Sequence, residues 1–242
     1  GLTMAQVAIV GAGPAGMAAA ISVTEAGCNV LLVDEALRPG GQIYRQAAEG
    51  LAAPEVGSTP ERRRKASLLR SFEAVRTRID YRTATTAHSL YPGPELQIAT
   101  DTASERVTPG AIVLATGVSE RCVPVPGWTL PGVLYAGGLQ ALMKSSGVVP
   151  SGRIVVCGAG VLPLAVGAQV MQAGGDVPAI ALLHPLSTLA TDPVGLLAGR
   201  SIVAEGLQLL WALRRARVEI LQGWGPTAIE GSDRVEAIVL AP

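Results

Sequence analysis

The sequence predicts an α/β protein built from two Rossmann-like βαβ units. Residues 5–34 have the pattern strand, glycine-rich turn, helix and strand, and residues 153–183 repeat that layout, with Gly158 in the place of Gly11. A G-x-G-x-x-G turn between a buried strand and a helix is the fingerprint of a dinucleotide-binding βαβ unit. The hydrophobic fraction of 49% supplies enough apolar surface for the core of such a fold.

The first unit carries the complete fingerprint. A β-branched run at 5–10 leads into GAGPAG, an alanine-rich helix closed by Gly27 follows, and a second buried strand ends at Asp34. The glycines remove Cβ atoms that would block the tight turn, the approach of a pyrophosphate and the packing of helix on strand. Free N–H groups at the start of the helix attract a diphosphate. The residues predicted to hold it are Gly11, Gly13, Pro14, Ala15 and Gly16.

The end of the second strand predicts which ribose is bound. Asp34 is expected to accept hydrogen bonds from a ribose 2′-OH, which favours an unphosphorylated adenosine ribose. The strand end is uncertain by one residue, so Glu35 could share this role. The loop ALRPGGQIYRQ at 36–46 follows, and it is either a surface turn or a second backbone approach to the same cofactor.

The middle of the chain predicts a helix with a basic solvated face at 60–78. Short strands at 79–83, 95–99 and 105–107 then suggest a small antiparallel meander. AIVLATG at 111–117 is typical of a buried strand that ends in a small-residue turn. An irregular proline-rich segment at 123–133 and a helix around 137–146 complete this part.

The second βαβ unit departs from the fingerprint. Pro163 replaces the third glycine, and the second strand ends at His184-Pro185 without an acid. Proline is tolerated in the first turn of a helix, so the fold is expected to survive. Gly158 and Gly160 are candidate nucleotide contacts, and a structural relic that binds nothing is an equal alternative. An amphipathic helix at 201–216 and short strands follow.

Composition excludes several other classes of protein. The 19 Lys and Arg residues balance 19 Asp and Glu residues, so no basic excess exists to neutralise nucleic-acid phosphates. Three cysteines and two histidines without ligand spacing predict no metal site, and free thiols indicate a cytoplasmic setting. The apolar windows 122–143 and 154–175 are long enough for a bilayer, but prolines and glycines interrupt them, so no transmembrane span is expected.

Several segments together resemble a known family. GAGPAGMAAAI, LLVDE, PGGQIYR and IVLATGVSERCVPVPGWTLPGV are similar to the two-dinucleotide-binding-domain flavoproteins, which have the disulfide-reductase-like fold. The similarity is strongest to alpha-type subunits of hydrogen cyanide synthase, opine oxidase and hetero-oligomeric proline or hydroxyproline dehydrogenases. It implies FAD on the first unit, and leaves open a second nucleotide, NAD(P) or ATP, at the 158–163 turn. The further FAD contacts that it implies are Gly41, Gln42, Ala115, Thr116 and Gly117.

The resemblance also implies an organisation and a function. Residues 1–122 would form the N-terminal part of an FAD-binding domain and 123–242 a second, NAD(P)-like domain, and these 242 residues are expected to lack the C-terminal return of the FAD domain. The expected function is an FAD-binding subunit of a hetero-oligomeric dehydrogenase or oxidase that acts on the C–N bond of an amino acid, imino acid or opine and passes electrons to an acceptor. Membrane association through the partner subunits stays open.

Two alternative functions remain. One is an NAD(P)H-dependent flavin reductase without a redox disulfide, because the loop at 40–46 contains no cysteine. The other is a structural nucleotide-binding subunit of such a complex. No catalytic acid, base or nucleophile can be assigned, and Arg45 is a candidate to contact the cofactor or an anionic substrate.

Overall fold

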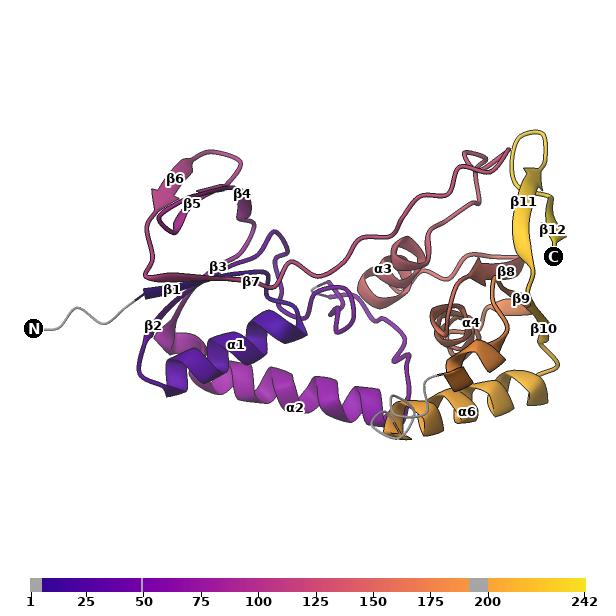
Figure 1. The fold of residues 1–242 in the computed structure, drawn as a ribbon, viewed down its shortest axis with the longest axis horizontal. Coiled ribbons are helices and arrows are strands. Elements are labelled where there is room, and N and C mark those ends of the chain that lie inside the picture. Colours follow the sequence, from indigo (N-terminus) through magenta and orange to yellow (C-terminus); the bar gives the residue numbers. More distant parts are fainter. Residues whose placement is uncertain (1–5, 49, 192–199) are drawn as a thin grey trace, which may run out of the picture. The chain divides into compact units, whose positions relative to one another are not determined.

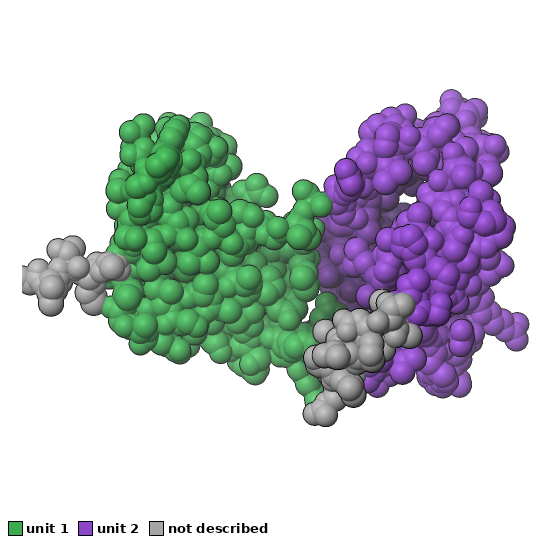
Figure 2. Space-filling view, viewed as in Figure 1, with its two compact units in different colours: residues 1–46, 59–119 green, residues 47–58, 120–242 purple. Residues whose placement is uncertain are grey.

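The computed structural model describes residues 6–48, 50–191 and 200–242. The chain divides into two compact units, which Figure 2 colours separately. Unit 1 comprises residues 1–46 and 59–119, and unit 2 comprises residues 47–58 and 120–242. In the sequence, residues 47–58 of unit 2 lie between the two segments of unit 1. The division expected at residue 122 is contiguous and assigns these residues to the first domain. Which nucleotide each unit holds stays a prediction.

Unit 1 is built on a four-stranded parallel sheet. Its strand order is β3-β2-β1-β7, with β1 at Gln6–Val10, β2 at Asn29–Val33, β3 at Ile79–Arg82 and β7 at Ala111–Leu114. The run VAIV of β1 lies between two parallel partners and is apolar on both faces, as expected for a central parallel strand. This confirms the predicted first βαβ unit, whose helix is α1 at Pro14–Glu25.

Helices cover one face of this sheet and a second sheet covers the other (Figure 1). Helix α1 and helix α2 at Thr59–Val75 bury Met17 and Phe72 against Ile9 and Leu32. The three-stranded antiparallel sheet packs Leu96 and other apolar side chains against the opposite face. Its strands, in the order β4-β5-β6, are Thr86–Tyr91, Glu95–Ala99 and Ser104–Val107.

The predicted meander was wrong in its first strand. Ile79–Arg82 pairs parallel with β2, because it follows the crossover through α2 and the 3₁₀ turn η1 at Arg76–Arg78. The strand that does pair with β5 is Thr86–Tyr91, which lacks the apolar alternation that would have identified it, since it is exposed or half-buried throughout.

Unit 2 contains the second βαβ unit. Its parallel sheet has the order β10-β9-β8, with β8 at Arg153–Gly158, β9 at Asp176–Leu182 and β10 at Glu219–Gln222. Among its described residues, the helices are α3 at Ala136–Ser146, α4 at Leu162–Gln172 and α6 at Arg200–Arg215, and a short 3₁₀ turn η2 spans Leu186–Thr191. The antiparallel pair β11 at Gly225–Glu230 and β12 at Ala237–Ala241 ends the chain. The helices predicted around 137–146 and 201–216 are thus confirmed.

The two apolar windows of the sequence fold into ordinary elements of unit 2. The first contains the irregular segment and most of α3, and the second contains α4 and all of β8 except Arg153. In the described ranges, no helix combines the length and the hydropathy that a bilayer crossing requires.

Candidate cofactor site

The candidate site lies where the chain changes direction along the sheet of unit 1. From β1 the chain proceeds to β2 and β3 on one side, whereas β7 pairs with β1 on the other side. In open parallel sheets, ligands bind outside the carboxyl ends of the strands at such a switch point. Gly11 follows β1 directly and Ala115 follows β7, so the topology brings two of the predicted cofactor segments to this edge of the sheet.

Gly11 and Gly16 are glycines because the protein's own packing requires it. Gly11 has a φ of +99°, and a Cβ there would lie 2.4 Å from the carbonyl oxygen of Ala115. A Cβ on Gly16 would lie 1.7 Å from the carbonyl oxygen of Gly11. No side chain fits at such distances, so helix α1 can stand this close to the turn only through these two residues.

Gly13 has no such internal reason. It precedes α1 in an extended conformation with φ −69°, which any residue adopts, and the nearest described atom to a Cβ there would be the Cα of Gly41 at 3.9 Å. That distance is an ordinary van der Waals contact. The missing side chain therefore leaves room for a group from outside the chain, next to the free N–H groups of the helix start. This is the observation by which the turn fits the diphosphate of FAD.

The loop at 39–46 lies against the glycine turn. The N–H of Gly40 donates to the carbonyl oxygen of Ala12 at 2.8 Å, and a Cβ on Gly41, whose φ is +59°, would lie 2.9 Å from the Cα of Gly13. Gln42 Nε2 donates to the carbonyl oxygen of Val118 at 3.3 Å, just beyond the turn at 115–117. Of the two interpretations left open by the sequence, these contacts favour a second backbone approach to one ligand.

The carboxylate of Asp34 is tied to the same turn. It accepts the N–H of Ala12 at 2.5 Å through one oxygen and the N–H of Ala36 at 2.7 Å through the other. A carboxylate oxygen can accept about two hydrogen bonds, so each retains capacity for a ligand hydroxyl. Glu35 beside it is exposed and makes neither of these bonds. The ribose role predicted for Asp34, which Glu35 could share, stays a prediction, and of the two residues only Asp34 contacts the glycine turn through these bonds.

Sequence reasoning missed the backbone contacts that hold this site together. The donors are the backbone N–H groups of Ala12, Ala36 and Gly40, and the identity of a side chain does not predict such backbone bonds. Only the contact of Gly40 could have been suspected, because Pro-Gly-Gly is a turn sequence. Lys65 Nζ on α2 also donates to the carbonyl oxygen of Arg45 at 3.0 Å, which fastens the end of the loop. The role of the Arg45 guanidinium stays a prediction.

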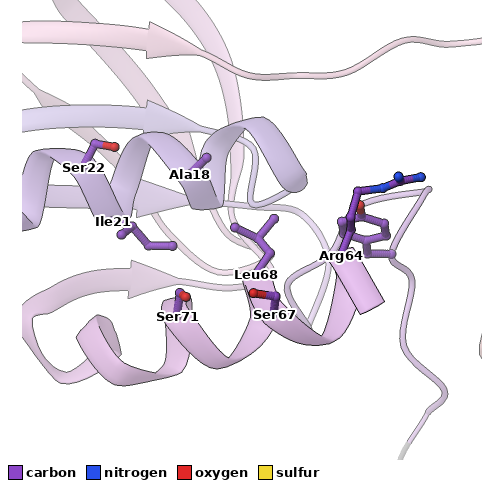
Figure 3. A pocket seen from close by; sticks show the side chains of 8 residues that line it. Ala18, Ile21, Ser22, Arg64, Ser67, Leu68 and Ser71 are labelled. Atoms are coloured by element: carbon purple, nitrogen blue, oxygen red, sulfur yellow. The ribbon is translucent and has the colours of Figure 1, made fainter. Parts of the chain in front are cut away.

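A separate surface groove runs between α1 and α2 (Figure 3). None of the predicted cofactor residues lines it, and it flanks the middle of α1 instead of its start. Its lining side chains are those of Ala18, Ile21, Ser22, Tyr44, Arg64, Ser67, Leu68 and Ser71. We therefore do not assign the cofactor to this groove.

The turn of the second unit keeps the fold but has different contacts. Gly160 has a φ of +68°, and α4 begins after Val161 with Pro163 in its first turn, as the sequence predicted. A Cβ on Gly158 would meet Pro163 Cγ at 3.0 Å. The close approach of α4 to β9 falls instead at Gly167, where a Cβ would meet Ile180 Cδ1 at 2.6 Å.

The cysteines do not form a redox pair. Cys28, Cys122 and Cys157 are free thiols, and none lies in the segments 11–16, 40–42 or 115–118. Burial raises the pKa of Cys157 to about 11, so its thiol stays protonated and unreactive near neutral pH. Tyr135 Oη donates to Cys122 Sγ at 2.6 Å within unit 2. In the described parts of the chain, no group of three His, Cys, Asp or Glu side chains could hold a metal ion.

Two relatives that are named as enzyme subunits match nearly the whole chain. The opine oxidase A subunit of Agrobacterium tumefaciens (strain Ach5) is 34% identical over 95% of this chain and 47% of its own length. Hydrogen cyanide synthase subunit HcnB of Pseudomonas aeruginosa is 35% identical over 97% of this chain and 50% of its own length. The chain thus spans about half the length of each of these relatives.

Solved structures share the fold at low sequence identity. The L-proline dehydrogenase from P. horikoshii superposes with a TM-score of 0.59 at 17% identity, over 97% of this chain and 38% of that one. Thioredoxin reductase from Lactococcus lactis gives a TM-score of 0.61 at 16% identity, over 98% of this chain and 70% of that one. The predicted disulfide-reductase-like α/β fold is confirmed.

The family itself is shown by a match that extends over nearly the whole chain. Residues 5–232 match the family described as pyridine nucleotide-disulphide oxidoreductase, and this range includes both glycine turns and the loop at 39–46. The chain therefore belongs to the pyridine nucleotide-disulphide oxidoreductase family.

Proposed function

We propose that this chain is the FAD-binding subunit of a hetero-oligomeric dehydrogenase or oxidase that acts on the C–N bond of an amino acid, imino acid or opine. Electrons from the substrate would pass through the complex to an acceptor. The proposal is supported by the relatives, whose names describe them as subunits of opine oxidase and hydrogen cyanide synthase. It rests above all on Gly13, a glycine of the fingerprint that the chain's own packing does not require.

The residues of unit 1 have distinct tasks in this proposal. The N–H groups at the start of α1, beyond Gly13, would bind the diphosphate, and Asp34 would accept the adenosine ribose hydroxyls. Gly41 and Gln42 would lie along the cofactor from one side, and Ala115–Gly117 from the other. When bound, FAD would supply the redox chemistry, and these residues would hold and orient it.

The alternative of an NAD(P)H-dependent flavin reductase needs a working nucleotide site in unit 2. The prediction of a second nucleotide, NAD(P) or ATP, concerns the same turn at 158–163. A structural nucleotide-binding subunit would keep FAD on unit 1 but take no part in electron transfer. Whether the 158–163 turn can bind a nucleotide therefore decides between the reductase alternative and the other two functions.

The first experiment identifies the bound ligand. The full-length protein is expressed, purified, denatured and centrifuged, and the released small molecules are identified by mass spectrometry alongside the visible spectrum of the native protein. We expect FAD close to one per chain. Release of FMN alone, or of no flavin after incubation with excess FAD, would contradict the proposal.

The second experiment tests the complex and its electron donor. The chain is co-expressed with the genes next to its own and purified through a tag on this chain only. We expect a second subunit to co-purify and an amino acid, imino acid or opine to bleach the flavin under anaerobic conditions. A chain that binds FAD, stays alone and is bleached by NADH would instead identify the reductase alternative.

A further inference from the structure

The two glycine turns can be aligned through their strand registers. In unit 1 the last β1–β2 pair is Val10 with Val33, so the next step brings Gly11 beside Asp34. In unit 2 the last β8–β9 pair is Gly158 with Leu182. Leu182 therefore occupies the position of the ribose-binding carboxylate. Because Leu182 is completely buried in the core of unit 2, that position is a packing position and not a solvated polar one.

The N-terminus of α4 has also lost part of its capacity to bind a diphosphate. α1 starts at Pro14, where proline removes only an N–H of the first position, which has no partner in the helix anyway. α4 starts one residue later in the alignment, at Leu162, and its proline follows in the first turn as Pro163. A proline there removes an N–H from the set that would face a phosphate.

Large apolar side chains surround the second turn. Pro14 and Ala15 of unit 1 correspond in the alignment to Val161 and Leu162, whose exposed fractions are 45% and 51%. Leu183, directly after β9, is 44% exposed and lies beside Gly225. A pyrophosphate and two ribose hydroxyls would thus meet aliphatic groups that offer no hydrogen bonds and would lose contact with water.

From these three observations we infer that the glycine turn of unit 2 does not hold a pyridine dinucleotide. The turn keeps its backbone shape because the parallel sheet and α4 need it for packing, as Gly158 against Pro163 and Gly167 against Ile180 indicate. The chain therefore takes no electrons from NADH or NADPH at this turn. This inference concerns unit 2 alone and goes beyond the proposed binding of FAD to unit 1.

Isothermal titration of the full-length protein with NADH and with NADPH tests this directly. We expect no saturable heat up to about 1 mM ligand, which corresponds to a binding free energy weaker than about −4 kcal/mol. The same preparation is titrated with FAD after removal of any bound flavin. This separates the two ideas, since failure to bind FAD would refute the proposed function and leave the result for the nicotinamide nucleotides unaffected.

If NADH does bind, a charge variant at the turn shows whether the binding site is the glycine turn of unit 2. Leu162→Glu places a carboxylate in the first turn of α4, where it is compatible with the helix and repels a phosphate. Gln208→Glu, on an exposed position of α6, adds the same charge elsewhere. Saturable binding of NADH that Leu162→Glu weakens at least about tenfold, and Gln208→Glu leaves unchanged, would overturn the inference. Binding that both variants leave unchanged lies away from the turn, and the inference would stand.

Discussion

The two glycine turns of this protein share the strand–turn–helix layout, but the contacts that explain their glycines differ. In the first turn, Gly11 and Gly16 are required by contacts within the chain, whereas Gly13 leaves space that the chain does not use. In the second turn, Gly158 packs against a proline, and apolar side chains stand around the start of the helix. A glycine fingerprint therefore predicts the βαβ fold reliably. In the second turn the counterpart of Gly13 is Gly160, where a Cβ would also meet no atom within 4 Å, but its φ of +68° is itself a reason for a glycine. Gly13 has neither a positive φ nor a close contact to explain it, which is why it indicates a ligand.

The largest expected change in stability comes from Gly16→Ala. The added Cβ would lie 1.7 Å from a backbone oxygen that cannot move without opening the turn, so we expect the free energy of unfolding of unit 1 to fall by about 3 kcal/mol or more. Urea denaturation followed by circular dichroism measures this. Gly138→Ala in α3 is the matched control, because no atom lies within 4 Å and the helix should gain about 0.5–1 kcal/mol.

In unit 2 the residue that corresponds to Gly16 is Pro163, and its replacement by alanine is expected to cost less stability. Pro163→Ala removes a ring from a site where a side chain already fits, so it should cost no more than about 1.5 kcal/mol. Equal losses for Gly16→Ala and Pro163→Ala would show that the two turns pack alike, which would contradict the different reasons assigned to their glycines.

Asp34→Asn is expected to have an intermediate effect. Its amide can accept one of the two backbone N–H groups but presents a donor to the other, so about 1.5–3 kcal/mol of charge-assisted hydrogen bonding is lost. The affinity for FAD should fall at least about tenfold, measured by equilibrium titration of the flavin-free protein. Glu35→Gln serves as control, since the exposed Glu35 makes neither bond. A larger effect from Glu35→Gln would move the ribose role to that residue.

The two units should also respond differently to alkaline pH. Burial raises the pKa of Cys157 to about 11 in unit 2 and the pKa of Tyr81 to about 12 in unit 1, the latter with a contribution from Asp34. For each group the unfolded chain releases its proton first, so stability is complete below the unfolded pKa and falls as pH rises. Unit 2 should begin to weaken near pH 9, and unit 1 near pH 10.

This loss is expected to be at most about 2 kcal/mol for Cys157, because its thiol keeps some contact with water. Urea denaturation at pH 8, 9, 10 and 11 measures the slope. In Cys157→Ala, the fall in the free energy of unfolding between pH 9 and 11 should disappear. In Cys122→Ala, which removes an exposed thiol, this fall should remain. An unchanged slope in Cys157→Ala would contradict the assignment.

The sequence was sufficient for the parts of the protein where local pattern and tertiary packing agree. The strand–turn–helix pattern around Gly11 predicts the first unit almost to the residue. It failed at Thr86–Tyr91, where side chains on both faces contact water, and at Ile79–Arg82, whose parallel partner depends on a long crossover. It could not predict that Leu182 takes the place of Asp34, because that depends on a one-residue difference in register.

Gly13→Ala tests most directly the proposal that FAD binds against Gly13. A methyl group there has 3.9 Å of clearance and an allowed backbone conformation, so the stability of the flavin-free protein should change by less than about 0.5 kcal/mol. The methyl would nevertheless stand where the diphosphate approaches. We predict that FAD affinity falls at least about tenfold with the melting temperature of the flavin-free protein unchanged. Unchanged FAD affinity in Gly13→Ala would contradict the claim.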